Sequence, residues 1–158
     1  MKVFCPALLS GKYFATKHAI REIQGGQNIS PRVSWSEIPA GTKSFALSMV
    51  DRHPIANNWV HWLVLNIPAS TREIPEKASG PYDRMPAGCM ETRNSYGDIG
   101  YGGPMPPRGS GPHEYVITVY ALSVESLLLG PFAKLDECLR ALEGKILASA
   151  NVTGIFQQ

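Results

Sequence analysis

The sequence predicts a mostly β protein in which two antiparallel sheets form a Greek-key β-sandwich, with one amphipathic helix late in the chain. Two observations favour this class. Thirteen prolines and fifteen glycines interrupt a chain of 158 residues, and its strand-like segments stand far apart with long polar stretches between them. The length fits a single domain, residues 1–158, with one core of its own.

The first half of the chain carries two weak strand signals and two strong ones. A short strand is possible at 12–16, and an extended piece is expected at 33–35, between prolines. Residues 43–51 alternate in the period of a strand with both faces at least partly covered. Residues 59–67, WVHWLVLNI, are almost continuously apolar and rich in branched and aromatic side chains, as is typical of a central strand.

The second half opens with a long polar segment. Residues 69–101 are rich in glycine and proline, and a loop of that length usually serves a site or covers one. Residues 115–122, YVITVYAL, predict a third clear strand, and 151–156 predict a last short one. Between them, apolar residues recur at steps of four, three and four, which predicts an amphipathic helix through Leu135, Leu139, Leu142 and Ile146.

Composition excludes several functions. Fifteen basic against thirteen acidic residues leave a formal charge of +2 without charge runs, so no whole-molecule field recruits nucleic acid or an anionic membrane. Three cysteines at wide spacing indicate neither a zinc cluster nor a disulfide framework, which fits a reducing compartment. Because the first apolar run is short and broken by proline, and no run approaches about 20 residues, we expect a cytoplasmic protein without stable membrane insertion.

The candidate chemistry lies in two stretches, 51–61 (DRHPIANNWVH) and 101–115 (YGGPMPPRGSGPHEY). Asp51 ends one predicted strand and His61 lies in the next, so antiparallel pairing could bring the two side chains toward one end of a sheet. An aspartate beside a histidine fixes the imidazole tautomer and favours its protonated form. The alternative is a core histidine with satisfied hydrogen bonds and an exposed aspartate at a strand end.

His113 follows a run in which glycines alternate with prolines. Glycine lets the backbone approach a ligand and turn its N–H groups inward, while proline fixes the wall, so this run could hold an anion. The alternative is a rigid surface turn. Repetition favours the site, because Tyr115 and a second strand-associated histidine belong to the same two stretches. His18 is expected at the surface.

Enzyme signatures are weak, and we predict no catalytic residue, metal ligand or cofactor. The chain has no GxSxG elbow, no cysteine in a nucleophile signature, no P-loop and no dinucleotide fingerprint. Three histidines and a carboxylate, His53, His61, His113 and Asp51, could in principle ligate zinc or iron. Their spacing matches no recognised ligand motif.

Four segments, in this order, resemble the phosphatidylethanolamine-binding protein family, which includes the Raf kinase inhibitor proteins and many bacterial and archaeal relatives. They are NISPRVSW from Asn28, PAGTKSFALSMVD from Pro39, WVHWLVLNIP from Trp59 and the GxxPPxGxGxHxY-like YGGPMPPRGSGPHEY. The resemblance covers nearly the whole chain and is strongest to the short prokaryotic subfamily. It implies a β-sandwich of two antiparallel sheets with a small anion pocket at one end.

The resemblance also implies pocket residues. They match the family's motifs at Asp51, Trp59, His61, Gly103, Pro106, Pro107, His113 and Tyr115. The sequence departs from the family's motifs at two further positions that we also expect in the pocket. His53 stands near the place of the family's second aspartate, and Met105 occupies a position that is glycine in eukaryotic members. Losing an anionic group makes the pocket better suited to a bare anion than to phosphatidylethanolamine.

These residues lead to three hypotheses. The first is a non-enzymatic binding protein for phosphate or a phosphorylated small molecule, with His61 and His113 donating hydrogen bonds and affinity rising as the pH falls. The second is an interaction protein that regulates a kinase or protease by docking a phosphorylated or acidic side chain. The third is a hydrolase or metal enzyme using the same pocket. Prokaryotic relatives also suggest a homodimer.

Overall fold

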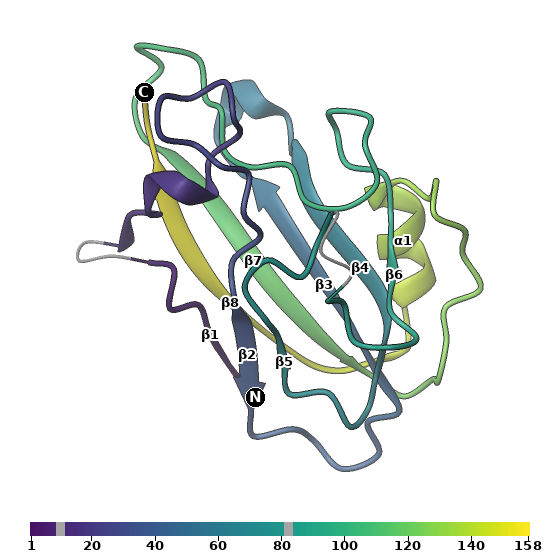
Figure 1. The fold of residues 1–158 in the computed structure, drawn as a ribbon. Helices are drawn as coiled ribbons and strands as arrows, with labels where there is room; N and C mark the ends of the chain where they lie inside the picture. The colour runs from purple at the N-terminus through teal and green to yellow at the C-terminus, as the bar shows by residue number, and fades with distance from the viewer. Residues whose placement is uncertain (9–11, 81–83) are drawn as a thin grey trace.

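A computed structural model describes residues 1–8, 12–80 and 84–158 of the chain, and Figure 1 shows two β-sheets beside one α-helix. The smaller sheet has the order β1 (Lys2–Phe4), β2 (Val33–Ser36), β5 (Glu73–Ile74). The larger sheet has the order β6 (Met90–Glu91), β4 (Val60–Pro68), β3 (Ser44–Asp51), β7 (His113–Leu122), β8 (Ile146–Phe156). Every pair of neighbouring strands is antiparallel.

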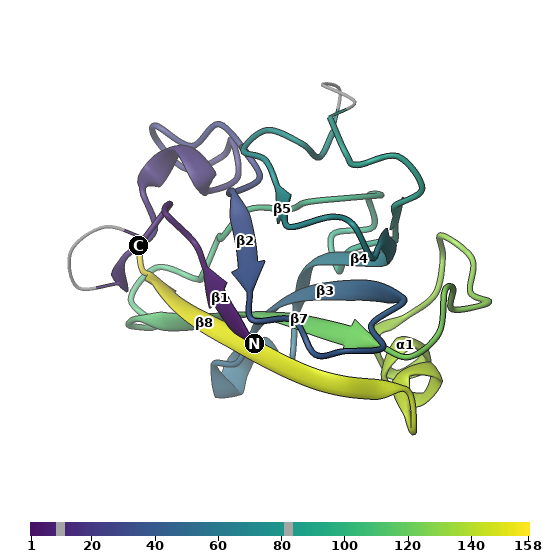
Figure 2. The same cartoon turned by 90° about the horizontal axis from the view of Figure 1, so that it is seen from below.

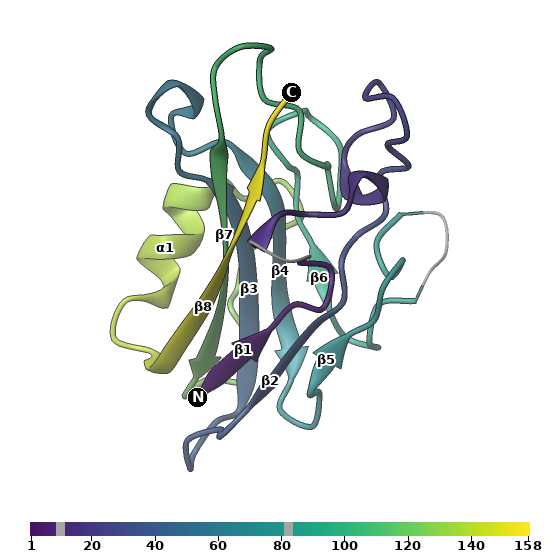
Figure 3. The same cartoon turned by 90° about the vertical axis from the view of Figure 1, so that its left-hand side faces the viewer.

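The two sheets pack as layers, with the smaller one over one face of the larger (Figure 2). The main hydrophobic core lies between them and includes Trp35, Phe45, Trp62 and Ile117. A second cluster on the opposite face packs against helix α1 (Leu135–Leu142), which lies on that side in Figure 3. Strand β3 is therefore buried along its whole length, as expected for a strand with both faces covered.

The predicted class is confirmed: the structure is mostly β, with two antiparallel sheets and one helix. Two boundaries differ. The helix ends at Leu142, and Gly144 then adopts a left-handed φ of 69°, which suits a helix terminus. Strand β8 begins two residues later, at Ile146, and pairs with β7 along almost its full length. It is much longer than the predicted 151–156. The small side chains at its start have little strand preference, and hydrogen bonding to β7 makes these residues extended.

The weak strand predicted at 12–16 is wrong. Tyr13 and Phe14 each form an isolated β-bridge, and the chain then enters a short 3-10 helix, η2 (Thr16–His18). A second 3-10 turn, η3 (Pro54–Ala56), links β3 to β4. Strand β1 was not predicted, and it pairs with β2 at the edge of the smaller sheet. Short strands that depend on a single neighbour leave little periodic signal.

The strand register brings the candidate residues to one end of the larger sheet. Asp51 is the cross-strand partner of Tyr115, and His113 lies two residues before Tyr115, so its side chain falls on the same face. In β4, Val60 pairs with Val50 while Trp62 pairs with Met49. His61 is the extra residue of this β-bulge. The bulge places His61 next to Trp62 on the face that looks toward the smaller sheet.

Candidate functional site

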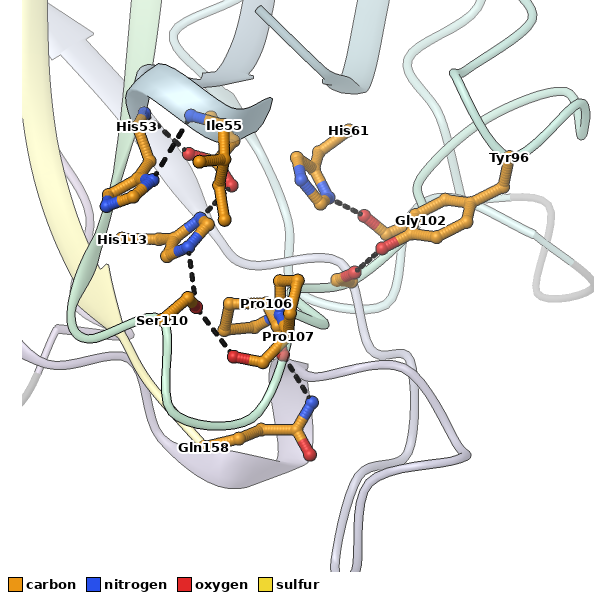
Figure 4. Close-up of polar contacts among 12 residues, drawn as sticks. His53, Ile55, His61, Tyr96, Gly102, Pro106, Pro107, Ser110, His113 and Gln158 are labelled. Carbon is orange, nitrogen blue, oxygen red and sulfur yellow. Dashed lines mark hydrogen bonds and ion pairs between the residues drawn. The ribbon is translucent and has the colours of Figure 1, made fainter. Parts of the chain in front are cut away.

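A cavity of about 260 Å³ opens at this end of the larger sheet, where Figure 4 shows His113 on the left, His61 on the right, and Pro106 and Pro107 below them. Its walls come from the ends of β3, β4 and β7, from η3 and from the loops around Tyr96 and Pro106. The eleven lining residues are Asp51, Ile55, Ala56, Trp59, His61, Tyr96, Met105, Pro106, Pro107, His113 and Tyr115.

Eight of the ten residues named from the sequence line this cavity, and two do not. His53 stacks on the far side of His113, with ring centroids 3.9 Å apart and planes inclined by 13°. Gly103 lies behind the residues that line the cavity, where its N–H donates to the side chain of Asn28. Sequence reasoning missed Ile55, Ala56 and Tyr96, which carry no motif; an aromatic residue alone in a polar loop is a weak signal.

One wall, which we call the His113 wall, consists of Asp51, His53, Ser110 and His113. The Nδ1–H of His113 donates to Oδ2 of Asp51 at 2.6 Å, and the other carboxylate oxygen accepts the backbone N–H of His53 at 2.8 Å. Nε2 of His113 lies 3.0 Å from the hydroxyl oxygen of Ser110. Both nitrogens of His113 are therefore engaged by the protein.

The opposite wall, which we call the His61 wall, consists of Trp59, His61, Tyr96 and Gly102. The backbone carbonyl of Gly102 accepts a hydrogen bond from Nδ1 of His61 at 2.7 Å. Since a carbonyl can only accept, this contact places a proton on Nδ1. The ring of Tyr96 packs edge-on against both His61 and Trp59. No hydrogen bond among the described residues uses Nε2 of His61.

His61 is neutral at physiological pH. Burial lowers its pKa from 6.5 to about 4, and this effect outweighs the hydrogen bond to Gly102 and the attraction of Asp51, which act in the opposite direction. A neutral imidazole with its proton on Nδ1 presents a lone pair on Nε2. The expectation that His61 donates to an anion therefore requires that Nε2 take up a proton on binding, because in the unliganded protein this nitrogen is an acceptor.

Tyr115 supplies the complementary group. Its side chain lines the cavity, and its hydroxyl oxygen is buried near the carboxylate of Asp51 without a hydrogen bond of normal geometry among the described residues. Burial, together with the nearby Asp51 carboxylate, raises the pKa of Tyr115 well above its ordinary value, so the hydroxyl keeps its proton. A buried hydroxyl without a partner costs free energy, about 1 to 3 kcal/mol. A ligand oxygen that accepted this hydrogen bond would remove that cost.

The glycine- and proline-rich wall is fixed by backbone contacts. The N–H of Gly102 donates to the carbonyl of His61 at 2.8 Å, and the N–H of Gly103 donates to the side chain of Asn28 at 2.7 Å. A Cβ at Gly103 would lie 2.3 Å from the backbone oxygen of His18, so this position requires glycine. Gly103 thus shapes the cavity from behind.

His18 is not at the surface, contrary to expectation. It is fully buried, and its Nδ1–H donates to the carbonyl of Ile29 at 2.7 Å. Burial lowers its pKa, as it does for His61. Nε2 of His18 is enclosed, with the nearest carboxylate oxygen, on Glu76, 3.9 Å away. The same imidazole-to-carbonyl pairing therefore occurs twice, but only His61 lines this cavity.

The mouth of the cavity is apolar. Ile55, Trp59 and Met105 are 61%, 38% and 39% exposed, respectively, and all three line the cavity. No lysine or arginine is among the lining residues. In the part of the chain that the structure describes, no group of three or more histidine, cysteine, aspartate or glutamate side chains is arranged to hold a metal ion.

The fold and the site together define the class of protein. The family model for phosphatidylethanolamine-binding protein matches residues 6–157, and the chain belongs to that family.

Three similar proteins come from bacteria. A protein of Aquifex aeolicus named UPF0098 is 42% identical over 135 residues, covering 84% of this chain and 77% of its own length. YbhB of Escherichia coli is 35% identical over 158 residues, covering 99% of both chains. The crystal structure of Escherichia coli YbcL, described as a member of the mammalian PEBP family, superposes with a TM-score of 0.90 at 33% identity, covering 99% of this chain and 98% of that one.

No helix in the described residues is long and apolar enough to cross a bilayer. The cytoplasmic location stays a prediction.

Proposed function

We propose that this protein binds a small oxyanion in its protonated form, such as phosphate or a phosphomonoester monoanion, in the cavity between the His61 and His113 walls. The observation that carries the proposal is the pair of polar atoms that the protein leaves unused there: the Nε2 acceptor of His61 and the hydroxyl donor of Tyr115. One group on the ligand must donate and another must accept. A P–OH group beside a P–O oxygen provides both.

The apolar lining supports a ligand of low charge. Asp51 and His113 form a buried ion pair when the imidazole is protonated, and the cavity has no further cationic side chain. A dianion would enter this space without a counter-charge, which is costly in a buried site. A monoanion that shares its proton with His61 meets a smaller penalty.

The proposal requires proton uptake on binding. A phosphomonoester has a second pKa of about 6. Above that pH, the fraction of the ligand in its monoanionic form falls about tenfold for each pH unit. The proton rests either on the ligand or on Nε2 of His61, and the pH dependence is the same in both cases. Asp51, His113, Tyr96 and Tyr115 are the titratable groups around His61, and both tyrosines keep their protons because burial raises their pKa values.

Calorimetric titration with phenyl phosphate from pH 8 to pH 6 tests this function. We expect the affinity to rise by at least about tenfold over that range. The substitution His61→Asn keeps an N–H toward Gly102 but removes the Nε2 acceptor, so it should weaken binding at pH 6 and flatten the profile.

His18→Asn is the matched control, since His18 makes the same 2.7 Å contact to a carbonyl away from the cavity. It should leave the pH profile of binding intact. An affinity for phenyl phosphate that is independent of pH, or a His61→Asn variant with the wild-type profile, would contradict the proposal.

The apolar mouth favours a second candidate, in which the oxyanion belongs to a phosphorylated side chain of a kinase, protease or other partner protein. Ile55, Trp59 and Met105 would then contact the residues beside the phosphate. Phosphopeptides with apolar flanking residues should bind more tightly than phenyl phosphate, and Met105→Ser should reduce only the peptide affinity. If Met105→Ser reduced the affinities for the phosphopeptide and for phenyl phosphate equally, Met105 would belong to the phosphate site, and the apolar mouth would not bind flanking peptide residues. The homodimer stays a prediction.

A further inference from the structure

Asp51, His113 and Ser110 form a continuous carboxylate–imidazole–hydroxyl chain, drawn in Figure 4 from His113 to Ser110. Oδ2 of Asp51 lies 2.6 Å from Nδ1 of His113, and Nε2 of the same ring lies 3.0 Å from Oγ of Ser110. The three residues come from the end of β3, the start of β7 and the loop before β7. This is the order and spacing in which a serine hydroxyl becomes a nucleophile.

The chain is held at its carboxylate end. The backbone N–H of His53 donates to Oδ1 of Asp51, and His53 stacks against the imidazole of His113. Both Asp51 and His113 are buried, so the ring cannot easily turn. With Nδ1–H directed to the carboxylate, a neutral His113 presents its Nε2 lone pair to Ser110, as a general base must.

The Ser110 hydroxyl has two acceptors within reach, Nε2 of His113 at 3.0 Å and the carbonyl of Pro107 at 2.6 Å. Its single proton can turn to either one, and rotation toward Nε2 requires no movement of the backbone. Ser110 is half-buried. The neighbouring Gly109 and Gly111 have φ values of 77° and 86°, and a Cβ at either position would meet nothing within 4 Å. A small ester can therefore approach Oγ.

The surroundings indicate the class of substrate. His113 and Pro107, the two hydrogen-bond partners of Ser110, both line the cavity, whose other lining residues include Ile55, Trp59 and Met105. Such a surface would hold a short hydrocarbon group. The backbone N–H groups of Gly109 and Gly111 take part in no hydrogen bond among the described residues. They are donors available to the oxygen of a reacting carbonyl.

We propose that Ser110 is the nucleophile of a serine esterase centre for small apolar carboxylic esters, an activity separate from oxyanion binding and contrary to the expectation of a non-enzymatic protein. Oγ of Ser110 bonds to the ester carbonyl carbon while its proton passes to Nε2 of His113. The carbon–oxygen bond to the alcohol then breaks, and His113 returns the proton to the departing oxygen. Water, deprotonated by His113, cleaves the acyl–Ser110 bond to release the acid, and Oγ regains the proton.

The test combines covalent labelling with kinetics. Incubation of the wild-type protein with an alkyl fluorophosphonate, followed by peptide mass spectrometry, should place the adduct on Ser110. Hydrolysis of p-nitrophenyl acetate should fall at least about tenfold in Ser110→Ala. It should stay unchanged in Ser149→Ala, which removes an exposed hydroxyl from the edge strand β8.

Labelling at other residues with none at Ser110, or equal ester hydrolysis by wild type and Ser110→Ala, would overturn the proposal. Thermal unfolding and phenyl phosphate affinity of Ser110→Ala show whether that variant is folded, and the labelling of wild-type protein requires no variant. Because oxyanion binding rests on His61 and Tyr115, loss of either proposal leaves the other standing: a protein that is labelled at Ser110 but ignores phenyl phosphate supports the esterase alone.

Discussion

The two walls of the cavity hold a buried histidine in opposite ways. His61 gives its Nδ1–H to an uncharged backbone carbonyl and leaves Nε2 toward the cavity. His113 gives its Nδ1–H to the carboxylate of Asp51 and has Ser110 at its other nitrogen. Burial keeps the first ring neutral, whereas the second ring shares a hydrogen bond with a buried carboxylate. Two imidazoles of one cavity therefore serve as an acceptor and as part of a hydrogen-bonded chain.

The largest expected effect breaks the His113 wall. In Asp51→Asn the single amide oxygen can accept from Nδ1 of His113 or from the backbone N–H of His53, but not from both, so one buried donor loses its partner. Removing one member of a buried ion pair typically costs about 3 to 5 kcal/mol, to be measured as the free energy of unfolding in urea. Asp98→Asn, an exposed control, should change it by less than about 0.5 kcal/mol. If Asp51→Asn lowered the free energy of unfolding only slightly, the carboxylate of Asp51 would not be what distinguishes the His113 wall from the His61 wall.

The second prediction uses pH to test the His61 wall. The unfolded chain protonates His61 near its ordinary pKa of 6.5, whereas the folded protein resists protonation until about 4. Between these values the unfolded state binds more protons, so stability is fully present above pH 6.5 and falls as the pH drops. The contribution of His61 is about 3 kcal/mol over this range.

The measurement compares urea unfolding of wild type and His61→Asn at several pH values. The difference between the two should shrink as the pH falls from 6.5 to 4, since the variant lacks the titrating group. Burial also lowers the pKa of His18, and that common contribution cancels in the comparison. A difference that is constant with pH would mean that the folded protein protonates His61 as readily as the unfolded chain does.

A smaller effect concerns the support of the His61 wall. In Gly103→Ala the new methyl group would meet the backbone oxygen of His18 at 2.3 Å, and overpacking of this kind costs about 1 to 3 kcal/mol. Displacement of the wall should also weaken binding of phenyl phosphate. Gly130→Ala is the control, because nothing lies within 4 Å of a Cβ there and its φ is not left-handed. If the two variants had similar free energies of unfolding, the backbone around Gly103 and His18 would be able to shift without loss of stability.

The smallest expected effect comes from His53, which stacks on His113 but does not line the cavity. His53→Ala should lower the free energy of unfolding by about 1 kcal/mol and leave the affinity for phenyl phosphate nearly unchanged. Arg52→Ala, at an exposed neighbouring position, is the control. A loss of affinity above about tenfold, or 1.4 kcal/mol, would make His53 a ligand contact after all.

The strands that frame the site were predictable because their side chains carry a periodic or continuous apolar pattern. Residues 43–51, 59–67 and 115–122 correspond to β3, β4 and β7. The motif residues at the ends of these strands pointed to Asp51, His61 and His113. Strand β8 was underestimated because Ala148, Ser149 and Ala150 have little strand preference of their own, and their pairing with β7 decides their conformation.

The sequence by itself determined the β-rich class, the family and the residue types at one end of the larger sheet, since these follow from local patterns and motifs. Only the tertiary structure decided what each histidine does. The bulge at His61 turns that side chain onto the inner face, burial removes its charge, and pairing of β3 with β7 aligns Asp51, His113 and Ser110. Solvent exclusion and hydrogen-bond direction arise from contacts between segments distant in the chain, which no local pattern encodes.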